Sequence, residues 1–229
     1  MSCKGINLAL TKRAYPPNKM KQNLLAICTN LSICSQLQTL QGVEWSADFS
    51  QMERASLVLV DAAELEDPTL IAALQGFSGC IGIRALIAWP SQSHLLPQTN
   101  LFRFHGLSSA PVLAPKADFQ LEIAIASTSK PDLVSSGLSQ LGIHPIIVPD
   151  TIGFAGPRVL AMVVNEAHLV AEGGIASHQD IDTSMRYGTN YPMGPFEWEQ
   201  YWGQDVLKSI MQALNHQNPT RYLLCTAYE

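Results

Sequence analysis

The chain has 229 residues, of which 47% are hydrophobic and 14% are charged, and its formal net charge is −5 at pH 7. These proportions are typical of a protein with buried cores and exclude a disordered chain. The negative balance argues against a broad nucleic-acid surface, which needs a basic face. The first residues carry no basic segment before an apolar run, and no stretch reaches the roughly 20 apolar residues of a membrane-spanning helix. We therefore expect a cytoplasmic protein that binds neither nucleic acid nor membrane.

The first half of the chain alternates short apolar runs with helical segments. Strands are predicted at 24–28, 42–48, 56–61 and 80–88, and helices at 31–40 and 68–77. Between Ser56 and Asp61 this run is wholly apolar (Leu-Val-Leu-Val), as in a strand that is buried on both faces. This alternation predicts a parallel sheet with helices on both faces, in a reduced Rossmann-like pattern. A helix and strand over 133–148 then lead to a domain junction near 149–153.

The rest of the chain is predicted to be helical. Glycine pairs and N-capping residues mark the ends of its helices, because glycine takes a left-handed cap without steric cost and serine accepts a backbone N–H. Three helices are predicted, which begin at Pro157, after Ser177 and at Gly194-Pro195, and which end at Gly173-Gly174, near Gly188 and beyond Leu214. The chain thus divides into an α/β domain, 1–149, and an all-α domain, 150–229.

The five cysteines are widely spaced and include no C-x-x-C pair. We expect reduced thiols and no metal site, because Asp180 and Asp182 also lack a histidine at ligand spacing. His168 and His216 are expected on the solvent-facing sides of their helices.

Three motifs follow one another in the helical part: the segment from Asp150 to Arg158, Asn165-Glu-Ala167 and Tyr191-Pro-Met-Gly-Pro-Phe196. In this order they resemble motifs of the 3-hydroxyacyl-CoA dehydrogenase family. In the α/β part, Phe102-Arg-Phe-His-Gly-Leu107 and Leu121-Glu-Ile-Ala124 are similar to the family's R-F-I-G-L and L-V-E-V segments. The resemblance implies a Rossmann-like domain followed by a helical domain of the family's C-terminal type, which in the family forms the subunit interface.

The resemblance also implies NAD as cofactor, held by a glycine-rich turn at a helix N-terminus. In this chain Cys28, Asn30 and Ile33 stand where the three glycines are expected. Side chains at these places would meet the pyrophosphate or separate the helix from the strand. The expectation is that NAD is not bound in the usual way, which leaves the cofactor of this chain unknown.

The family's general base is a histidine that a glutamate orients. Its place falls here on Ser108, which has no base of its own to activate it. Glu122 matches the orienting glutamate, and His105 is the alternative base if the two segments are aligned differently. The family's substrate-contacting asparagine falls on Pro157, which has no side-chain donor or acceptor. Ser91 is a further candidate for a ligand contact, in the loop that follows the fourth predicted strand.

Three readings follow for the function of this chain. The leading one is a degenerate 3-hydroxyacyl-CoA dehydrogenase-like homodimer, a pseudoenzyme with weak or no NAD-dependent turnover that binds an acyl-CoA-like ligand between the domains. The second is an active dehydrogenase of fatty-acid metabolism that uses His105 and Glu122. The third is a structural partner that pairs with a full-length paralogue through the helical domain.

Overall fold

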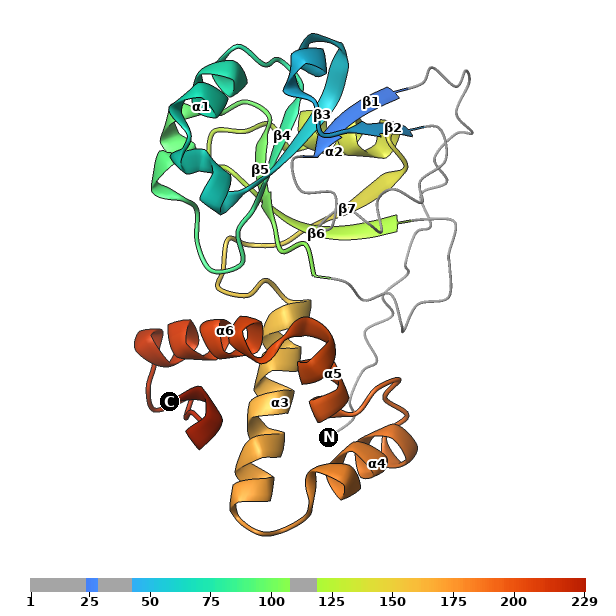
Figure 1. The fold of residues 1–229 in the computed structure, drawn as a ribbon, viewed down its shortest axis with the longest axis vertical. Helices are drawn as coiled ribbons and strands as arrows, with labels where there is room; N and C mark the ends of the chain where they lie inside the picture. The colour runs from blue at the N-terminus through green and yellow to red at the C-terminus, as the bar shows by residue number, and fades with distance from the viewer. Residues whose placement is uncertain (1–23, 29–42, 108–118) are drawn as a thin grey trace, which may run out of the picture.

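The computed structural model describes residues 24–28, 43–107 and 119–229, and it has two lobes (Figure 1). The upper lobe holds a sheet and the helices that cover it. The lower lobe holds helices alone. The predicted helix at 31–40 lies outside the described residues. The combination of a Rossmann-like sheet with a helical domain confirms the predicted fold class.

Seven strands form one sheet within the described residues, in the order β2-β1-β3-β4-β5-β6-β7. Neighbouring strands are parallel except for β5 and β6, which are antiparallel. The strands are β1 (Leu24–Cys28), β2 (Val43–Ser46), β3 (Ala55–Asp61), β4 (Cys80–Arg84), β5 (Leu101–Phe104), β6 (Phe119–Ile125) and β7 (Ile143–Ile147). Because β5 and β6 are antiparallel, the carboxyl end of β5 at Phe104 lies beside Ile123 in the middle of β6.

Alternate residues of the central strands enter two different cores, because successive side chains of a strand point to opposite faces. Leu57 and Leu59 of β3 pack with α2 (Pro131–Gln140). Val58 and Val60 pack in the other core, with α1 (Pro68–Gln75). The described part of this domain also has three short 3-10 helices, namely η2 (Phe49–Arg54), η3 (Ala62–Glu66) and η4 (Ser91–Leu95). The apolar runs therefore form a sheet that is covered on both faces, as predicted.

The fourth strand is shorter than predicted. β4 ends at Arg84, and the apolar residues that follow leave the sheet. Leu86 and Ile87 instead pack against the core of the helical domain, and the Leu86 carbonyl accepts a hydrogen bond from the Gly153 amide at 3.0 Å. The apolar run continues to 88 because this segment is buried in a second core, not because the strand continues.

The helical domain contains α3 (Gly156–Glu172), α4 (His178–Gly188), α5 (Pro195–Trp202), α6 (Gln204–Gln217) and the 3-10 helix η5 (Thr226–Tyr228). Gly174 has φ +67°, and the Ser177 hydroxyl accepts the Asp180 amide, so both predicted helix ends are confirmed. The single helix predicted from Gly194 through Leu214 is wrong. Gly203, with φ +92°, separates α5 from α6, because its backbone lies in a region that an α-helix cannot contain.

Two buried polar contacts interlock the helices. Asp182 of α4 accepts the Phe196 amide in the first turn of α5 at 2.9 Å, and a Cβ added to Gly194 would lie 2.2 Å from its Oδ1. Asn165 of α3 donates to the Leu223 carbonyl and accepts the Cys225 amide, so it holds the C-terminal segment. Glycine at 194 is therefore required by a close approach, not by its own dihedral angles.

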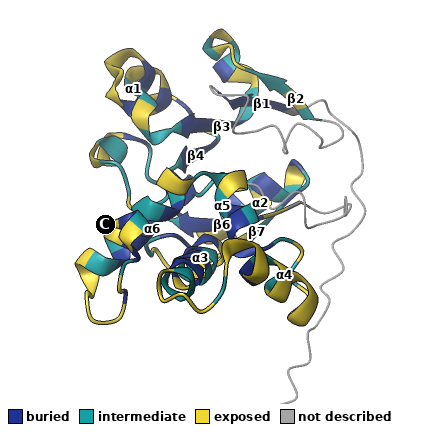
Figure 2. Cartoon of the chain, turned by 60° about the horizontal axis from the view of Figure 1, so that its bottom comes forward, coloured by how far each residue is buried: buried dark blue, intermediate teal, exposed yellow. Residues whose placement is uncertain are grey.

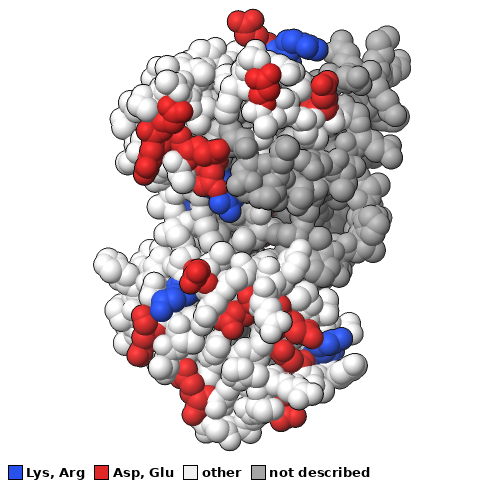
Figure 3. Space-filling view, in the orientation of Figure 1, with Lys and Arg blue, Asp and Glu red and all other residues white. Residues whose placement is uncertain are grey.

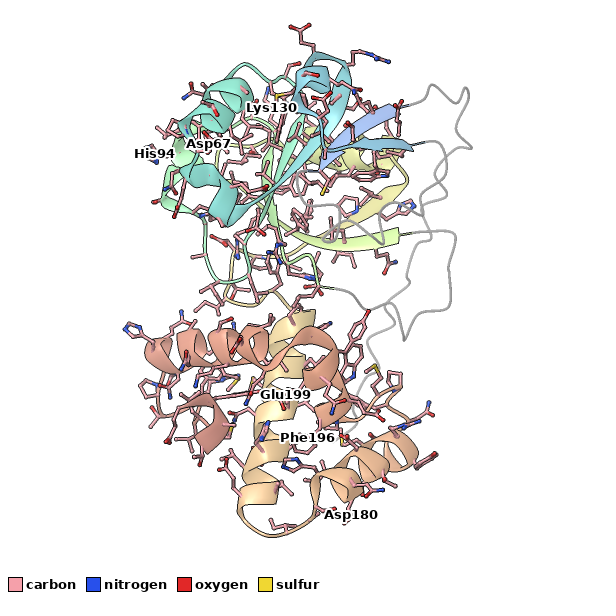
Figure 4. The ribbon with its side chains drawn as sticks, viewed as in Figure 1. Asp67, His94, Lys130, Asp180, Phe196 and Glu199 are labelled. Atoms are coloured by element: carbon pink, nitrogen blue, oxygen red, sulfur yellow. The ribbon has the colours of Figure 1, made fainter. Side chains whose placement is uncertain are left out.

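His168 is buried, which contradicts the expected solvent-facing position. Its Nε2 lies 3.0 Å from both carboxylate oxygens of Glu199 in α5, and Glu199 also accepts a hydrogen bond from the Tyr228 hydroxyl at 2.8 Å. Figure 4 labels Glu199 and Phe196 on α5, beside α3. His216 is exposed as expected, and α4 is largely exposed on its outer side (Figure 2).

The prediction that the cysteines are reduced thiols is wrong for one of them. Cys28 is disulfide-bonded, whereas Cys80 and Cys225 are free and buried. Among the described residues, no helix combines the length and apolar character needed to cross a bilayer. In that same part of the chain, no group of three or more His, Cys, Asp or Glu side chains could hold a metal ion.

Candidate functional site at the domain junction

The end of β5 and the start of the helical domain bring several polar side chains together. Arg103 pairs with Ala124 and Phe104 with Ile123 in the antiparallel ladder, which ends at Phe104. His105 is the next residue, and it lies near enough to Glu122 for that charge to act on it. Arg103 and His105 are two residues apart and thus point to one face of the sheet, the face opposite to Phe102 and Phe104. We call Arg103, His105, Glu122, Asp150 and Phe154 the junction cluster.

Arg103 is the most buried charged side chain of this cluster, with no exposed surface. Its guanidinium donates to the Ala85 carbonyl at 2.8 Å, to the Thr151 carbonyl at 3.0 Å and to the Asp150 carboxylate. Asp150 keeps half of its side chain exposed, so the pair is desolvated on one side only. Arg103 therefore joins the carboxyl end of β4 to the segment that enters α3.

Phe154 has a backbone conformation that is unusual for a large side chain, with φ +56°. Its ring is completely buried between the two domains. The Arg103 guanidinium lies 4.5 Å from the ring centroid, and the His105 ring contacts it edge-on at 5.4 Å between centroids. A conformation of this kind costs on the order of 1–3 kcal/mol, and the surrounding contacts hold it in place.

Glu122 caps a helix of the other domain. Its carboxylate accepts the Ala155 amide at 2.9 Å and the Gly156 amide at 3.1 and 3.2 Å. The N-cap residue of α3 is Ala155, whose side chain offers no acceptor, so Glu122 supplies the negative group that a helix N-terminus favours. Hydrogen bonds to an ionised group contribute about 1.5–3 kcal/mol each, which makes this the preferred place for the carboxylate.

His105 is held as a neutral imidazole. Its Nδ1 accepts the Leu107 amide at 3.0 Å, so the hydrogen of the neutral ring is assigned to Nε2. Burial lowers the pKa of His105 to about 4, although the negative charge of Glu122 acts in the opposite direction. At neutral pH the only acceptor nitrogen of this ring is thus already bonded to the backbone.

His105 and Glu122 are neighbours that do not form a dyad. Each has its acceptor atoms engaged by backbone amides, and no hydrogen bond joins the two side chains, both of which are described. A general base needs a free acceptor within hydrogen-bonding reach of the substrate hydroxyl. In this arrangement the neutral His105 ring has no free acceptor without a rearrangement, whereas the two amides leave lone pairs of the Glu122 carboxylate unused.

The other predicted site residues are dispersed. Pro157 is buried in the first turn of α3, one residue after the amides that Glu122 caps. Ser91 is exposed at the start of η4, where its hydroxyl donates to Gln92 at 2.9 Å. Cys28 ends β1 with its side chain in the sheet core. Asn30, Ile33 and Ser108 lie outside the described residues.

Arg103, Asp150 and Phe154 were not predicted as site residues. The sequence does contain an indication for Arg103. It is a charged residue within the apolar strand Leu101–Phe104, and a charged side chain that is buried in this way needs a partner. Nothing local in the sequence indicates that this partner is Asp150, which lies 47 positions later.

The comparisons with known proteins cover the two domains unequally. The family model described as "3-hydroxyacyl-CoA dehydrogenase, C-terminal domain" matches residues 153–228. The rat protein "Hydroxyacyl-coenzyme A dehydrogenase, mitochondrial" is 44% identical over 79 residues, which are 34% of this chain and 25% of that protein. The 3-hydroxyadipyl-CoA dehydrogenase of Escherichia coli K12 is 39% identical over 90 residues, 39% of this chain and 19% of that protein. The matches with these relatives thus span a quarter of their length or less.

Solved structures are similar over nearly the whole chain. The (S)-3-hydroxybutyryl-CoA dehydrogenase of Ralstonia eutropha has a TM-score of 0.69 and 17% identity, with 90% of this chain and 92% of that chain covered. The 3-hydroxybutyryl-CoA dehydrogenase of E. coli K12 has a TM-score of 0.65 and 19% identity, with 90% and 50% covered. At these identities the likeness concerns the fold. Residues 153–228 thus match the C-terminal domain of the 3-hydroxyacyl-CoA dehydrogenases by sequence, and the two-domain fold is similar to that of solved 3-hydroxybutyryl-CoA dehydrogenases.

Proposed function

We propose that this protein binds an acyl-CoA-like ligand at the junction of its two domains and turns it over slowly or not at all. The observation that carries the proposal is the state of His105 and Glu122, whose acceptor atoms are bonded to the backbone amides of Leu107, Ala155 and Gly156. A positioned general base contributes about 10²–10⁴-fold to a proton transfer. A protein with this fold but without a free general base could still bind the ligand, while the rate of its proton-transfer step would be much lower.

The described residues near the carboxyl ends of β3 and β4 do not fit NAD. Arg84 is the basic group there, and it is already paired with Asp61. Acidic side chains gather over η3 and the start of α1, as Figure 3 shows for this side of the sheet domain; they are Asp61, Glu64, Glu66 and Asp67. A pyrophosphate would meet like charges there, and the turn sequence supplies no glycine to expose backbone amides. We therefore assign no step to this cofactor.

Calorimetric titration with acetoacetyl-CoA tests the ligand. We expect saturable heat with acetoacetyl-CoA and less with free CoA, because the acyl group would enter the junction between the domains. A parallel assay with acetoacetyl-CoA and NADH should give a rate at least about 10²-fold below that of an active family member. No heat at high ligand concentration would reject the binding proposal, and a normal rate would reject the slow-turnover proposal.

The second candidate is a working dehydrogenase based on His105. It is supported by the charge of Glu122, which acts on the His105 ring. This candidate predicts NADH oxidation with acetoacetyl-CoA that His105→Gln abolishes and His216→Gln leaves unchanged, since His216 is exposed on α6. Equal rates in both variants would exclude His105 as the base.

Association of two copies through the helical domain, or of one copy with a longer paralogue, is also a proposal. It is supported by exposed large apolar side chains on that domain, namely Val159, Ile175, Tyr187, Tyr201 and Leu223. Sedimentation of the full chain over a concentration series tests it, and a monomer throughout would reject the homodimer. The cytoplasmic location likewise stays a prediction, since the rat relative is named as mitochondrial.

A further inference from the structure

The turn that enters α3 contains two residues with a left-handed backbone, Gly153 with φ +73° and Phe154 with φ +56°. This conformation is unfavourable for phenylalanine, so the surrounding contacts must hold it. From the sheet domain, Arg103 donates to the Thr151 carbonyl at 3.0 Å. From the helical domain, Arg158 donates to the Thr151 hydroxyl at 2.9 Å. Thr151, at the start of this turn, is therefore held from both domains through two different oxygen atoms.

The last part of the chain fixes the Arg158 guanidinium. Its Nη2 donates to the hydroxyl of Tyr222, which lies 64 positions later, and the guanidinium carbon lies 5.4 Å from the centre of that ring. Tyr222 is buried, and its carbonyl accepts a hydrogen bond from the Asn215 side chain of α6 at 2.7 Å. A hydrogen-bonded chain thus runs from Tyr222 through Arg158 to Thr151, the residue that the sheet domain also holds.

We propose that Tyr222 is a positioning residue for the domain junction, which acts through Arg158 on the turn at Phe154. The Phe154 ring contacts the His105 ring edge-on, with 5.4 Å between centroids. If the Tyr222 hydroxyl no longer fixes Arg158, Thr151 loses one of its two supports and the Phe154 ring moves relative to His105. The inference deepens the proposed function, on which its ligand arm rests, because the acyl-CoA-like ligand is proposed to bind at this junction.

The test compares two buried tyrosines of the C-terminal segment. Tyr222→Phe removes the hydroxyl that binds Arg158, whereas Tyr228→Phe removes one that donates to Glu199 of α5 at 2.8 Å. Both variants lose a hydrogen bond to a charged group, so both should be destabilised. The readout is the NMR resonances of the His105 ring in the full chain without ligand, because a neighbouring aromatic ring shifts them. We expect Tyr222→Phe to move these resonances and Tyr228→Phe to leave them unchanged.

Thr151→Val is the second variant, and it keeps the proposal testable if Tyr222→Phe does not fold. It removes the hydroxyl that Arg158 binds and keeps the shape of the side chain. It should move the His105 resonances in the same direction as Tyr222→Phe, and the double variant should move them little further, because both substitutions break one chain of contacts. Unchanged His105 resonances in Tyr222→Phe or in Thr151→Val would overturn the proposal, and so would an equal shift in Tyr228→Phe.

Calorimetric titration with acetoacetyl-CoA is the ligand arm of the test. Tyr222→Phe should weaken binding by about threefold or more relative to Tyr228→Phe, as for other couplings that pass through a chain of contacts. Equal affinities of the two variants would overturn the role of Tyr222 in ligand binding. A wild-type protein that gives no heat would reject the proposed ligand, while the His105 resonances would still decide whether Tyr222 positions the junction.

Discussion

Both domains have apolar cores, and they differ in the polar side chains that bind the backbone of another element, of which the helical domain has several. In the sheet domain the layers pack through apolar side chains, such as Leu57 and Val58 on the two faces of β3. In the helical domain, single polar side chains bind particular backbone groups of another element, as Asn165 and Asp182 do. Many apolar residues can fill a layer, whereas few can replace a side chain that caps a defined amide.

Sequence similarity to known proteins is also unequal between the two domains. The helical segment is 44% identical to the rat relative over 79 residues, while the whole fold is retained at 17% identity to the Ralstonia structure. The junction cluster combines both domains, because Arg103, His105 and Glu122 belong to the sheet domain and Asp150 and Phe154 to the helical domain. Substitutions at the junction and within the domains therefore test how much these polar contacts to the backbone contribute to the free energy of unfolding.

The largest effect is expected at Arg103. Arg103→Leu leaves the Ala85 and Thr151 carbonyls without their donor, and we expect a loss of about 3 kcal/mol in the free energy of unfolding, since each unsatisfied buried group costs about 1–3 kcal/mol. Asp150 adds little to this loss, because half of its side chain is exposed to water. Chemical denaturation measures it. Arg54→Leu on the exposed end of η2 is the control and should change the free energy by less than about 0.5 kcal/mol. Equal effects at the two sites would show that the junction is not a specific contact.

Gly194→Ala tests the interlock between α4 and α5. The new Cβ would lie 2.2–2.4 Å from three atoms of Asp182, so the carboxylate must leave the Phe196 amide. We expect a loss of about 2–3 kcal/mol in thermal or chemical unfolding, from overpacking and a lost cap. Combining it with Asp182→Ala should make the two effects clearly non-additive. Additive losses would mean that the two residues do not interact.

His105 predicts a pH dependence of stability. Its pKa is lowered to about 4 in the folded protein from 6.5, so the unfolded chain binds more protons between these values. The contribution of His105 to stability is therefore complete above pH 6.5 and decreases as the pH falls towards 4. Between pH 8 and pH 5 the loss should be about 2 kcal/mol, and His105→Gln should remove it. If the wild type and this variant lose the same stability on acidification, His105 is not buried in the neutral state.

The smallest effect is expected at an exposed ion pair. Arg186 and Glu197 lie 2.9 Å apart, with 42% and 37% of their side chains exposed. Arg186→Ala should change the free energy of unfolding by less than about 0.5 kcal/mol, because water and salt screen such pairs. If Arg186→Ala lowered the free energy of unfolding as much as Gly194→Ala does, exposed ion pairs would matter as much as the buried contact of Asp182 with the Phe196 amide.

The elements of this protein were predictable where a local signal sets them. The apolar run 56–61 gave β3, and Gly174 and Ser177 gave the ends of α3 and α4. The errors have tertiary causes. Residues 85–88 look like a strand because a second core buries Leu86 and Ile87, and Gly203 was read as part of a helix because the apolar spacing continues across it.

The candidate site was predicted less completely. Sequence reasoning paired His105 with Glu122, and the charge of Glu122 does act on the His105 ring. It could not reveal that both side chains are bonded to backbone amides, because the donors belong to Leu107 and to a helix that begins more than thirty residues after Glu122. The partners of Arg103 are equally distant in the chain. Local patterns predict which groups are available, while long-range packing decides which of them remain free.

The segment after β4 has a consequence for how the helical domain could exist apart from the rest. Leu86 and Ile87 fill part of its interior, and the Leu86 carbonyl receives the Gly153 amide. A fragment cut at the domain junction would carry an apolar hollow where these two side chains belong. We therefore expect the helical domain to be more stable in a chimaera that includes residues 85–88 than in one that begins at the domain junction.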